Sequence, residues 1–178
     1  MVDDGYRRIG DDPFATPEEE RDPTRRLRGR LPAPVTVWTA ADRRGVRSGL
    51  TVSSVLVVEG EPPMVLGLIG PETALWDAVQ DSGRFTVHLM AEHQVRLADQ
   101  FAGRYPGDPF EGVAASDGGF GPVLDEVGTR AGCELAGYVE AGYFLLVRGV
   151  VANVEFAGSG RPLVHYGGRY LTTGPRSR

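Results

Sequence analysis

The sequence predicts an all-β protein with short helices, folded as one closed or partly closed β-barrel. Short runs rich in Val, Thr, Leu, Ile and Phe recur along the chain, and glycines or prolines separate them. Only two segments carry apolar residues at helical spacing. The 25 glycines suit the tight turns and bends of a small barrel. A chain of 178 residues is long enough for a single domain with a real core.

The expected strands follow one another from residue 31 onward. The first, at 35–39, follows two prolines, and a turn at 42–45 leads to a second at 46–58. A buried strand follows at 64–69, and a fourth lies at 85–90. Residues 105–122 are rich in Gly, Pro and Asp and are expected to form a loop, including the cluster GGFG at 118–121. Two longer strands are expected within 133–156, turning near 140–142, and a short one at 162–166.

Two helices interrupt this β pattern, at 71–82 and 92–102. Pro71 and Glu72 open the first and Gly83 closes it, while Gly103 follows the second. The apolar residues at helical spacing are Leu75, Ala78 and Val79 in the first helix, and Leu97, Ala98, Phe101 and Ala102 in the second.

Residues 1–30 differ in composition from the domain expected at 31–178. Half of them are charged, eight acidic and seven arginine, and aliphatic residues are few. Such a stretch cannot bury enough apolar surface to fold alone. We expect a flexible arm with a short helix around 18–27.

Charge and composition exclude several kinds of function. A net charge of −5 gives no general attraction to nucleic acid or to anionic membranes, so neither is an expected partner. No apolar run approaches the ~18 residues of a membrane span, and the first residues lack a signal peptide, so the expected location is cytoplasmic.

Specific catalytic chemistries are excluded by missing residue types. All 19 basic residues are arginine, which rules out a P-loop lysine and Schiff-base chemistry. The one cysteine, Cys133, lies in an apolar strand pattern and is expected to be an inert core residue. His88 and His93 are expected to be structural or surface residues, and no metal site is expected.

The stretch SGLTVSS at 48–54 is the most informative part of the chain. In a strand, Gly49, Thr51 and Ser53 share one face, and Ser54 joins them only if a bulge or turn intervenes. The glycine allows close approach, and the hydroxyls and main-chain N–H groups could hold a phosphate without lysine. The alternative is a strand with small polar residues on its solvent face.

Six segments together resemble the flavin reductase-like, FMN-binding split-barrel family, in the family's order and spacing. They are PVTVWT (34–39), SGLTVSS (48–54), EPPMVL (61–66), SGRFTVHL (82–89), LADQFAG (97–103) and RPLVHYGGRY (161–170). The resemblance covers roughly residues 31–172.

The resemblance implies a homodimer of Greek-key split barrels that binds FMN or FAD near the subunit interface. The implied reaction is hydride transfer from NADH or NADPH to flavin, often for a partner monooxygenase. Because the cofactors carry this chemistry, no protein residue is expected to be catalytic. The resemblance implies flavin contacts by Ser48, Gly49, Leu50, Thr51, Ser53, Ser54, Leu68, Ile69, Gly70, Ala74, Leu75, Gln100 and Phe101, and nicotinamide contacts by His165, Tyr166 and Gly167.

Two of the implied roles have structural alternatives. His165 either hydrogen-bonds the nicotinamide nucleotide or is an interface or surface residue. Trp76 either packs on a flavin or anchors the core or the dimer, which is the favoured interpretation.

The sequence also departs from the family at two places. Gly142-Tyr143-Phe144 stands where reductases of the family often carry Gly-Asp-His, and His88 stands where Asn is frequent. If the missing pair assists the nicotinamide, the chain is instead a flavin carrier or sensor without reductase activity. A third alternative is an enzyme that reduces a small organic substrate on bound flavin. The choice between FMN and FAD, and between NADH and NADPH, stays open.

Overall fold

A seven-stranded antiparallel sheet forms most of the protein. The computed structural model describes residues 8–9, 22–158 and 160–171. The sheet has the order β4-β3-β7-β10-β11-β6-β5. Its strands are β3 (Thr36–Ala41), β4 (Arg47–Val52), β5 (Val55–Val58), β6 (Met64–Ile69), β7 (Arg84–Leu89), β10 (Arg130–Ala141) and β11 (Phe144–Glu155). The prediction of a mostly β protein with short helices is confirmed.

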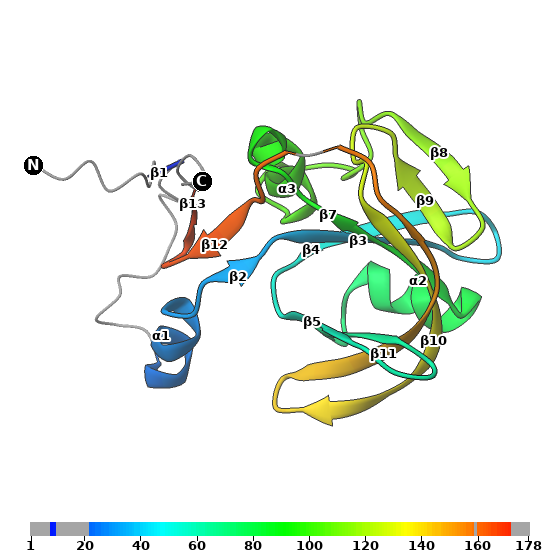
Figure 1. Cartoon of the computed structure of the whole chain (residues 1–178), viewed down its shortest axis with the longest axis horizontal. Coiled ribbons are helices and arrows are strands. Elements are labelled where there is room, and N and C mark those ends of the chain that lie inside the picture. The colour runs from blue at the N-terminus through cyan, green and yellow to red at the C-terminus, as the bar shows by residue number, and fades with distance from the viewer. Residues whose placement is uncertain (1–7, 10–21, 159, 172–178) are drawn as a thin grey trace, which may run out of the picture.

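The main sheet is curled (Figure 1). Its two edge strands, β4 and β5, follow one another directly in the chain. Residues 53–54 leave β4 at one edge and enter β5 at the other, and the Leu68 amide donates to the Ser54 carbonyl at 3.0 Å. In the described part of the chain no strand ladder joins β4 to β5, so the sheet stays open. The closed form of the barrel prediction is therefore wrong. The single strand expected at 46–58 is also wrong, because β4 pairs with β3 and β5 pairs with β6.

Both predicted helices are present, but the first begins at Ala74 and not at Pro71, because the capping side chain is that of Thr73. The Thr73 hydroxyl caps α2 (Ala74–Ser82) by accepting from the Trp76 amide at 3.3 Å, and Gly83 ends it at a φ of 71°. A 3₁₀ turn, η2 (Glu92–Gln94), leads into α3 (Val95–Phe101), and Gly103 follows with a φ of 73°. Both glycines occupy the left-handed conformation that ends many helices.

The core lies on both faces of β3. Trp38 belongs to one cluster, where its ring stacks on that of Phe85 at a centroid distance of 4.8 Å. Val37 belongs to the other cluster, which contains Phe101 of α3. A Cβ atom on Gly67 would lie 2.5 Å from the Trp38 ring, so the large indole requires a glycine opposite it. This double burial explains why every residue from 35 to 40 is buried.

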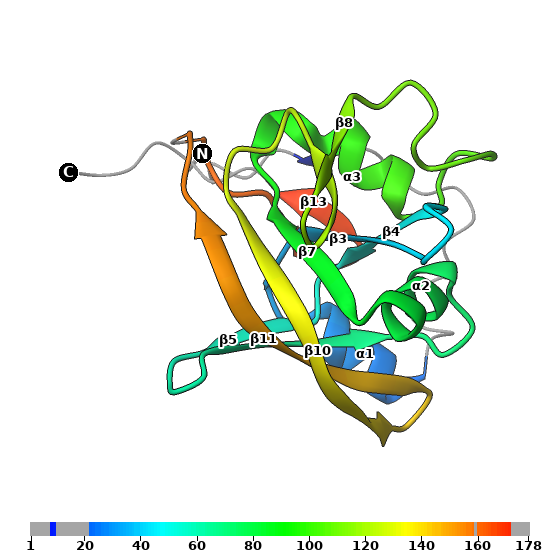
Figure 2. The same ribbon diagram turned by 90° about the vertical axis from the view of Figure 1, so that its right-hand side faces the viewer.

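Smaller elements complete the fold. The expected loop at 105–122 contains a hairpin of β8 (Ala115–Gly118) and β9 (Gly121–Leu124), and the GGFG cluster forms its turn. The strand expected at 162–166 is β12 (Val164–Tyr166), in a second sheet with β1 (Arg8–Ile9), β2 (Ala33–Pro34) and β13 (Arg169–Leu171). The β10–β11 hairpin extends beyond the rest of the main sheet (Figure 2).

A short helix, α1 (Pro23–Gly29), occupies part of the expected arm. It begins five residues later than the helix expected around 18–27, and residues 1–7 and 10–21 lie outside the described residues. In Figure 1, α1 lies at the same end of the molecule as β2, β12 and β13. Among the described residues, no helix has the length and apolar character needed to cross a membrane.

Candidate functional site

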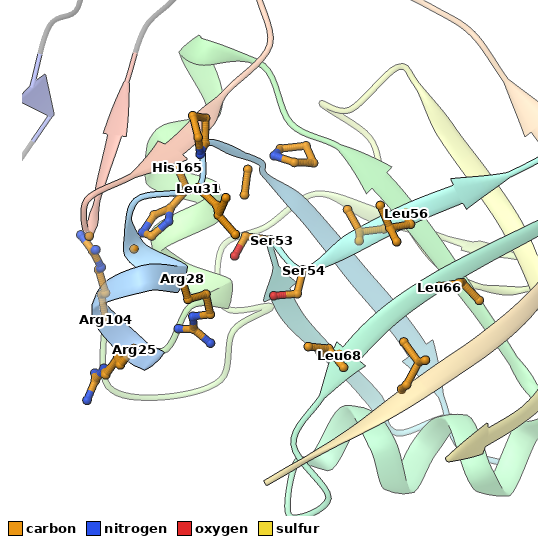
Figure 3. A pocket seen from close by; sticks show the side chains of 17 residues that line it. Arg25, Arg28, Leu31, Ser53, Ser54, Leu56, Leu66, Leu68, Arg104 and His165 are labelled. Carbon is orange, nitrogen blue, oxygen red and sulfur yellow. The ribbon is translucent and has the colours of Figure 1, made fainter. Parts of the chain in front are cut away.

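A pocket of about 750 Å³ lies where α1, the β4–β5 corner and β12 meet the outer face of β6. Figure 3 shows arginines at one end of it, Leu56 and Leu66 at the other end, and two serines between them. It is lined by Arg25, Arg28, Gly29, Leu31, Pro32, Ala33, Pro34, Ser53, Ser54, Val55, Leu56, Leu66, Leu68, Arg104, Leu146, His165 and Gly168.

The serines occupy the corner between β4 and β5. The chain must turn there to pass from one edge of the sheet to the other, so Ser53 and Ser54 leave the strand alternation and both line the pocket. Neither hydroxyl has a hydrogen-bond partner among the described residues, and both side chains are half-buried. Two small hydroxyls at an irregular corner form a suitable binding place for a phosphate.

Leucines form the apolar wall. The outer face of β6 presents Leu66 and Leu68, while Val65, Gly67 and Ile69 point into the core. Across the sheet, Leu66 pairs with Leu56 of β5, and Leu68 pairs with Leu146 of β11. Adjacent rows of leucine on a sheet give a broad apolar surface that can accept a planar ring system.

The opposite end of the pocket is basic. Arg25 and Arg28 come from α1, and Arg104 follows α3. Arg104 is held in place by an ion pair with Asp99 at 3.2 Å and by the Tyr170 ring, 5.5 Å from the guanidinium carbon. The guanidinium groups can bind phosphate oxygens through paired hydrogen bonds.

His165 lies beside these arginines in β12. Burial lowers the pKa of His165, and the positive charges of Arg104 and Arg28 lower it further. Its ring contacts Tyr170 edge-on at a centroid distance of 6.0 Å. The imidazole is therefore neutral at pH 7, and it can donate or accept a hydrogen bond without adding charge.

Four of the residues expected from the sequence meet in this pocket: Ser53, Ser54, Leu68 and His165. The face of β4 that carries Gly49 and Thr51 packs on α3 instead. A Cβ atom on Gly49 would lie 2.5 Å from the Phe101 ring, and the Thr51 hydroxyl donates to the Ala98 carbonyl at 2.6 Å. Packing against a helix thus accounts for the small and polar residues in this row.

The remaining expected residues lie outside the pocket lining. Gln100 donates to the carbonyls of Pro109 and Glu111 at 3.1 and 2.8 Å. Four of them are buried, Ser48, Ile69, Leu75 and Phe101, and Leu50 packs against the core. The others lie at the ends of elements: Gly70 follows β6, Ala74 begins α2, Tyr166 ends β12 and Gly167 follows it.

Three arginines and four leucines of the site were not predicted from the sequence. Arg25 and Arg28 fall in the expected flexible arm, and their spacing of three residues places both on one face of a helix. The arginine after α3 and the outward leucines of the strands carry no local signal, because alternation does not say what a strand face contacts. These arginines and leucines are Arg25, Arg28, Arg104, Leu31, Leu56, Leu66 and Leu146.

Other candidate groups have structural environments. Trp76 is buried and makes an edge-on contact with Tyr138 at 4.7 Å, which confirms the core interpretation. Cys133 is fully buried, which confirms that it is a core residue, and burial raises the pKa of its thiol to about 12. Within the described ranges no three His, Cys, Asp or Glu side chains gather to hold a metal ion.

The pocket suits a nucleotide with a planar ring. The leucine wall offers apolar surface, the serine corner offers unpartnered hydroxyls, and the arginine end offers positive charge. A flavin nucleotide has the matching parts in one molecule, a tricyclic ring joined to phosphate. The residues present therefore fit a bound flavin.

Comparison with known proteins agrees with this geometry. The family model described as flavin reductase like domain matches residues 28–174. A relative from Rhodococcus opacus, the reductase component of 4-nitrophenol 4-monooxygenase/4-nitrocatechol 2-monooxygenase, is 33% identical over 82% of this chain and 77% of its own length. NADH:riboflavin 5'-phosphate oxidoreductase from Streptomyces pristinaespiralis is 31% identical over 84% of each chain.

A solved structure gives the same result for the fold. Nitrilotriacetate monooxygenase component B from Mycobacterium thermoresistibile superposes with a TM-score of 0.77 at 27% identity, covering 87% of this chain and 90% of that chain. The matched segment contains the β4–β5 corner, the leucine wall, Arg104 and His165. The chain therefore belongs to the family of flavin reductase like domains.

Proposed function

We propose that this protein is an NAD(P)H:flavin oxidoreductase that supplies reduced flavin to a monooxygenase. The main observation that supports this proposal is one pocket in which an apolar wall adjoins hydroxyl and guanidinium groups. The chain that forms this pocket belongs to the family of flavin reductase like domains. The names of the two relatives support both halves of the proposal, since one is an NADH:riboflavin 5'-phosphate oxidoreductase and the other a monooxygenase reductase component. The cytoplasm is its proposed location because reduced nicotinamide nucleotides are supplied there.

The flavin, FMN or FAD, is assigned to the pocket with its ring on the leucine wall. Leu56, Leu66 and Leu68 would contact the ring, and the hydroxyls of Ser53 and Ser54 would donate to the first phosphate. Gly49 and Thr51 of the expected set act indirectly in this assignment, by setting how α3 packs behind the corner.

The nicotinamide nucleotide, NADH or NADPH, is assigned to the side of the pocket formed by β12. His165 lines the pocket there, and Tyr166 and Gly167 follow it. A neutral imidazole can hydrogen-bond an amide or a phosphate oxygen without electrostatic repulsion from the nearby arginines.

Little chemistry is required of the protein itself. A bound flavin supplies the acceptor for the hydride of reduced nicotinamide. The leucine wall excludes water from one face of the ring, and the serine corner fixes its phosphate end. His165 and the β12 main chain hold the donor against the open face. Holding the nicotinamide and flavin rings in contact lowers the activation free energy of hydride transfer, because the loss of translational and rotational freedom is already met by binding.

A homodimer of split, Greek-key barrels is part of the proposal. The sheet curls until its edge strands meet at one corner, which supports a split barrel. The outer face of β5, β6 and β11 exposes Leu56, Val58 and Phe144 by 66%, 41% and 37%. This apolar face is continuous with the leucine wall, so a second copy packed on it would help enclose the pocket. Light scattering that gives a monomer at working concentration would contradict the dimer.

Steady-state oxidation of NADH and NADPH with added FMN or FAD tests the activity. Turnover well above the rate without protein is expected with at least one pair. A yellow protein whose flavin is not bleached by either nucleotide without oxygen would instead be a carrier or sensor, the alternative that Tyr143 and Phe144 suggest. No turnover with any pair would overturn the proposal.

The binding assignment has its own test. Replacing both corner serines, Ser53→Ala with Ser54→Ala, should weaken FMN binding about tenfold or more, because each lost bond to a charged group is worth about 1.5–3 kcal/mol. Ser116→Ala is the matched control, since Ser116 lies in β8 and bonds Asp125 away from the pocket. Equal dissociation constants for the double variant and the control would show that the phosphate does not bind at the two serines.

A further inference from the structure

The helix α1 adds charge to the pocket without adding to the core. None of its residues is buried, and its one large apolar side chain, Leu27, is 65% exposed. The helix is nevertheless held in a defined place. The Asp22 carboxylate caps its start by accepting from the Thr24 amide at 2.8 Å, and the Gly29 carbonyl accepts from the Gly167 amide at 2.7 Å. Core packing therefore does not explain why α1 docks beside the pocket.

Arg25 and Arg28 are the side chains that α1 contributes to the pocket. They are three residues apart and share one helix face. Neither has an acidic or hydrogen-bonding partner within the described residues, whereas Arg104 beside them is paired with Asp99. Among the residues that the structure describes, no carboxylate pairs with these two guanidinium groups, and such an environment favours an anion.

The position of this charge distinguishes it from the serine corner. In Figure 3 the three arginines lie at the end of the pocket opposite Leu56 and Leu66, and the serines lie between. A ligand with its ring on the leucines and its first phosphate at the serines would direct any further phosphate toward the arginines. A mononucleotide ends at the first phosphate, but a dinucleotide continues through a diphosphate.

We propose that Arg25 and Arg28 bind the diphosphate of an adenine dinucleotide, so that α1 gives this pocket a preference for dinucleotides over mononucleotides. The inference rests on the proposed function and deepens it. Two ligands of the reaction carry this group, FAD and the nicotinamide adenine dinucleotide, and they are distinguished by experiment. Arg25 precedes the segment matched by the family model, and Arg28 is the first residue of that segment.

The test compares dissociation constants of the whole protein for two pairs of ligands. FAD against FMN isolates the flavin diphosphate, and NADH against reduced nicotinamide mononucleotide isolates the nicotinamide diphosphate. The variant is Arg25→Gln with Arg28→Gln. The matched control is Arg44→Gln with Arg96→Gln, which removes the same charge at exposed positions outside the pocket.

The double variant should bind one dinucleotide about tenfold or more weakly than the control does, and the matching mononucleotide within about twofold. Loss for FAD assigns the arginines to the flavin, and loss for NADH assigns them to the hydride donor. The loss should shrink at high salt, because these side chains are exposed. Arg25→Lys with Arg28→Lys keeps the charge but not the paired donors, and it should recover part of the affinity.

Two results would overturn the inference. Equal weakening of FMN and FAD, without any change in the NADH pair, would place the arginines on the phosphate common to both flavins. Unchanged dissociation constants for all four ligands would show that α1 does not take part in ligand binding. In either case the unaltered protein can still reduce flavin, so the proposed function survives; absence of flavin binding to the unaltered protein would overturn both.

Discussion

Mild acid should destabilise this protein through one buried imidazole, that of His88. The side chain is fully buried where β3, β7 and β9 meet. Its Nε2 accepts from the Leu124 amide at 3.1 Å, so Nδ1 carries the proton and donates to the Val37 carbonyl at 3.1 Å. Both ring nitrogens are used by the neutral form, and a second proton would break the bond to Leu124.

The magnitude follows from the two states of the imidazole. Burial lowers the pKa of His88 to about 4; the bond to Val37 opposes this shift and the charge of Arg130 adds to it. In the unfolded chain the pKa is about 6.5. The neutral imidazole thus stabilises the fold above the unfolded pKa, and this contribution is lost as the pH falls toward the folded value. Between about pH 7.5 and about pH 5.5 the loss is about 1.4 kcal/mol.

Urea unfolding of the unaltered protein and of His88→Asn at the two pH values measures this contribution. Asn keeps a donor and an acceptor but does not titrate. Imperfect hydrogen bonds should destabilise the variant by the same amount at both pH values. Between about pH 7.5 and about pH 5.5, the free energy of unfolding of the variant should therefore decrease by about 1.4 kcal/mol less than that of the unaltered protein. Parallel losses in the two proteins would refute the reasoning. If His88→Asn does not fold, His88→Gln or direct titration of the imidazole by NMR gives the same comparison.

Three further predictions concern packing behind the site. Gly49→Ala should lower the free energy of unfolding by about 1–3 kcal/mol, because the new Cβ would clash with the Phe101 ring. Adding Phe101→Leu to this variant should recover part of the loss in urea unfolding. If nothing is recovered, the Phe101 ring is not the group that clashes. Thr51→Val should lower the free energy of unfolding by about 1 kcal/mol, because it removes the hydrogen bond to the Ala98 carbonyl. The FMN dissociation constant, measured by fluorescence, should stay unchanged. A large loss of FMN affinity would show that Thr51 contacts the flavin. Cys133 should react with a thiol reagent at about pH 8 only after denaturation, and rapid labelling of the native protein would contradict its burial.

The spacing of apolar residues and the positions of glycine and proline were enough to predict most of the helices and strands. Both helices could be predicted because spacing, capping residues and closing glycines are local properties of the sequence. The strand containing Trp38 was evident because Val, Thr and Trp favour strands and two prolines precede them. Its burial on both faces was not evident, because Thr36 and Thr39 are buried only by donating to the carbonyls of Val52 and Pro122. The break between β4 and β5 was not evident, because Ser53 and Ser54 continue a β-like sequence and only pairing with two different neighbours ends the strand.

Composition limits the chemistry that this protein can perform, because the chain has no lysine and one cysteine, and the segment at 48–54 offers small hydroxyl residues to a nucleotide. Tertiary packing sets which of those hydroxyls face the pocket. Thr51 points to α3 while Ser53 and Ser54 turn to the pocket, because the chain must cross from one sheet edge to the other at that point. It likewise decided that Arg25 and Arg28 belong to the site, since a main-chain bond between Gly167 and Gly29, far apart in sequence, sets where α1 lies.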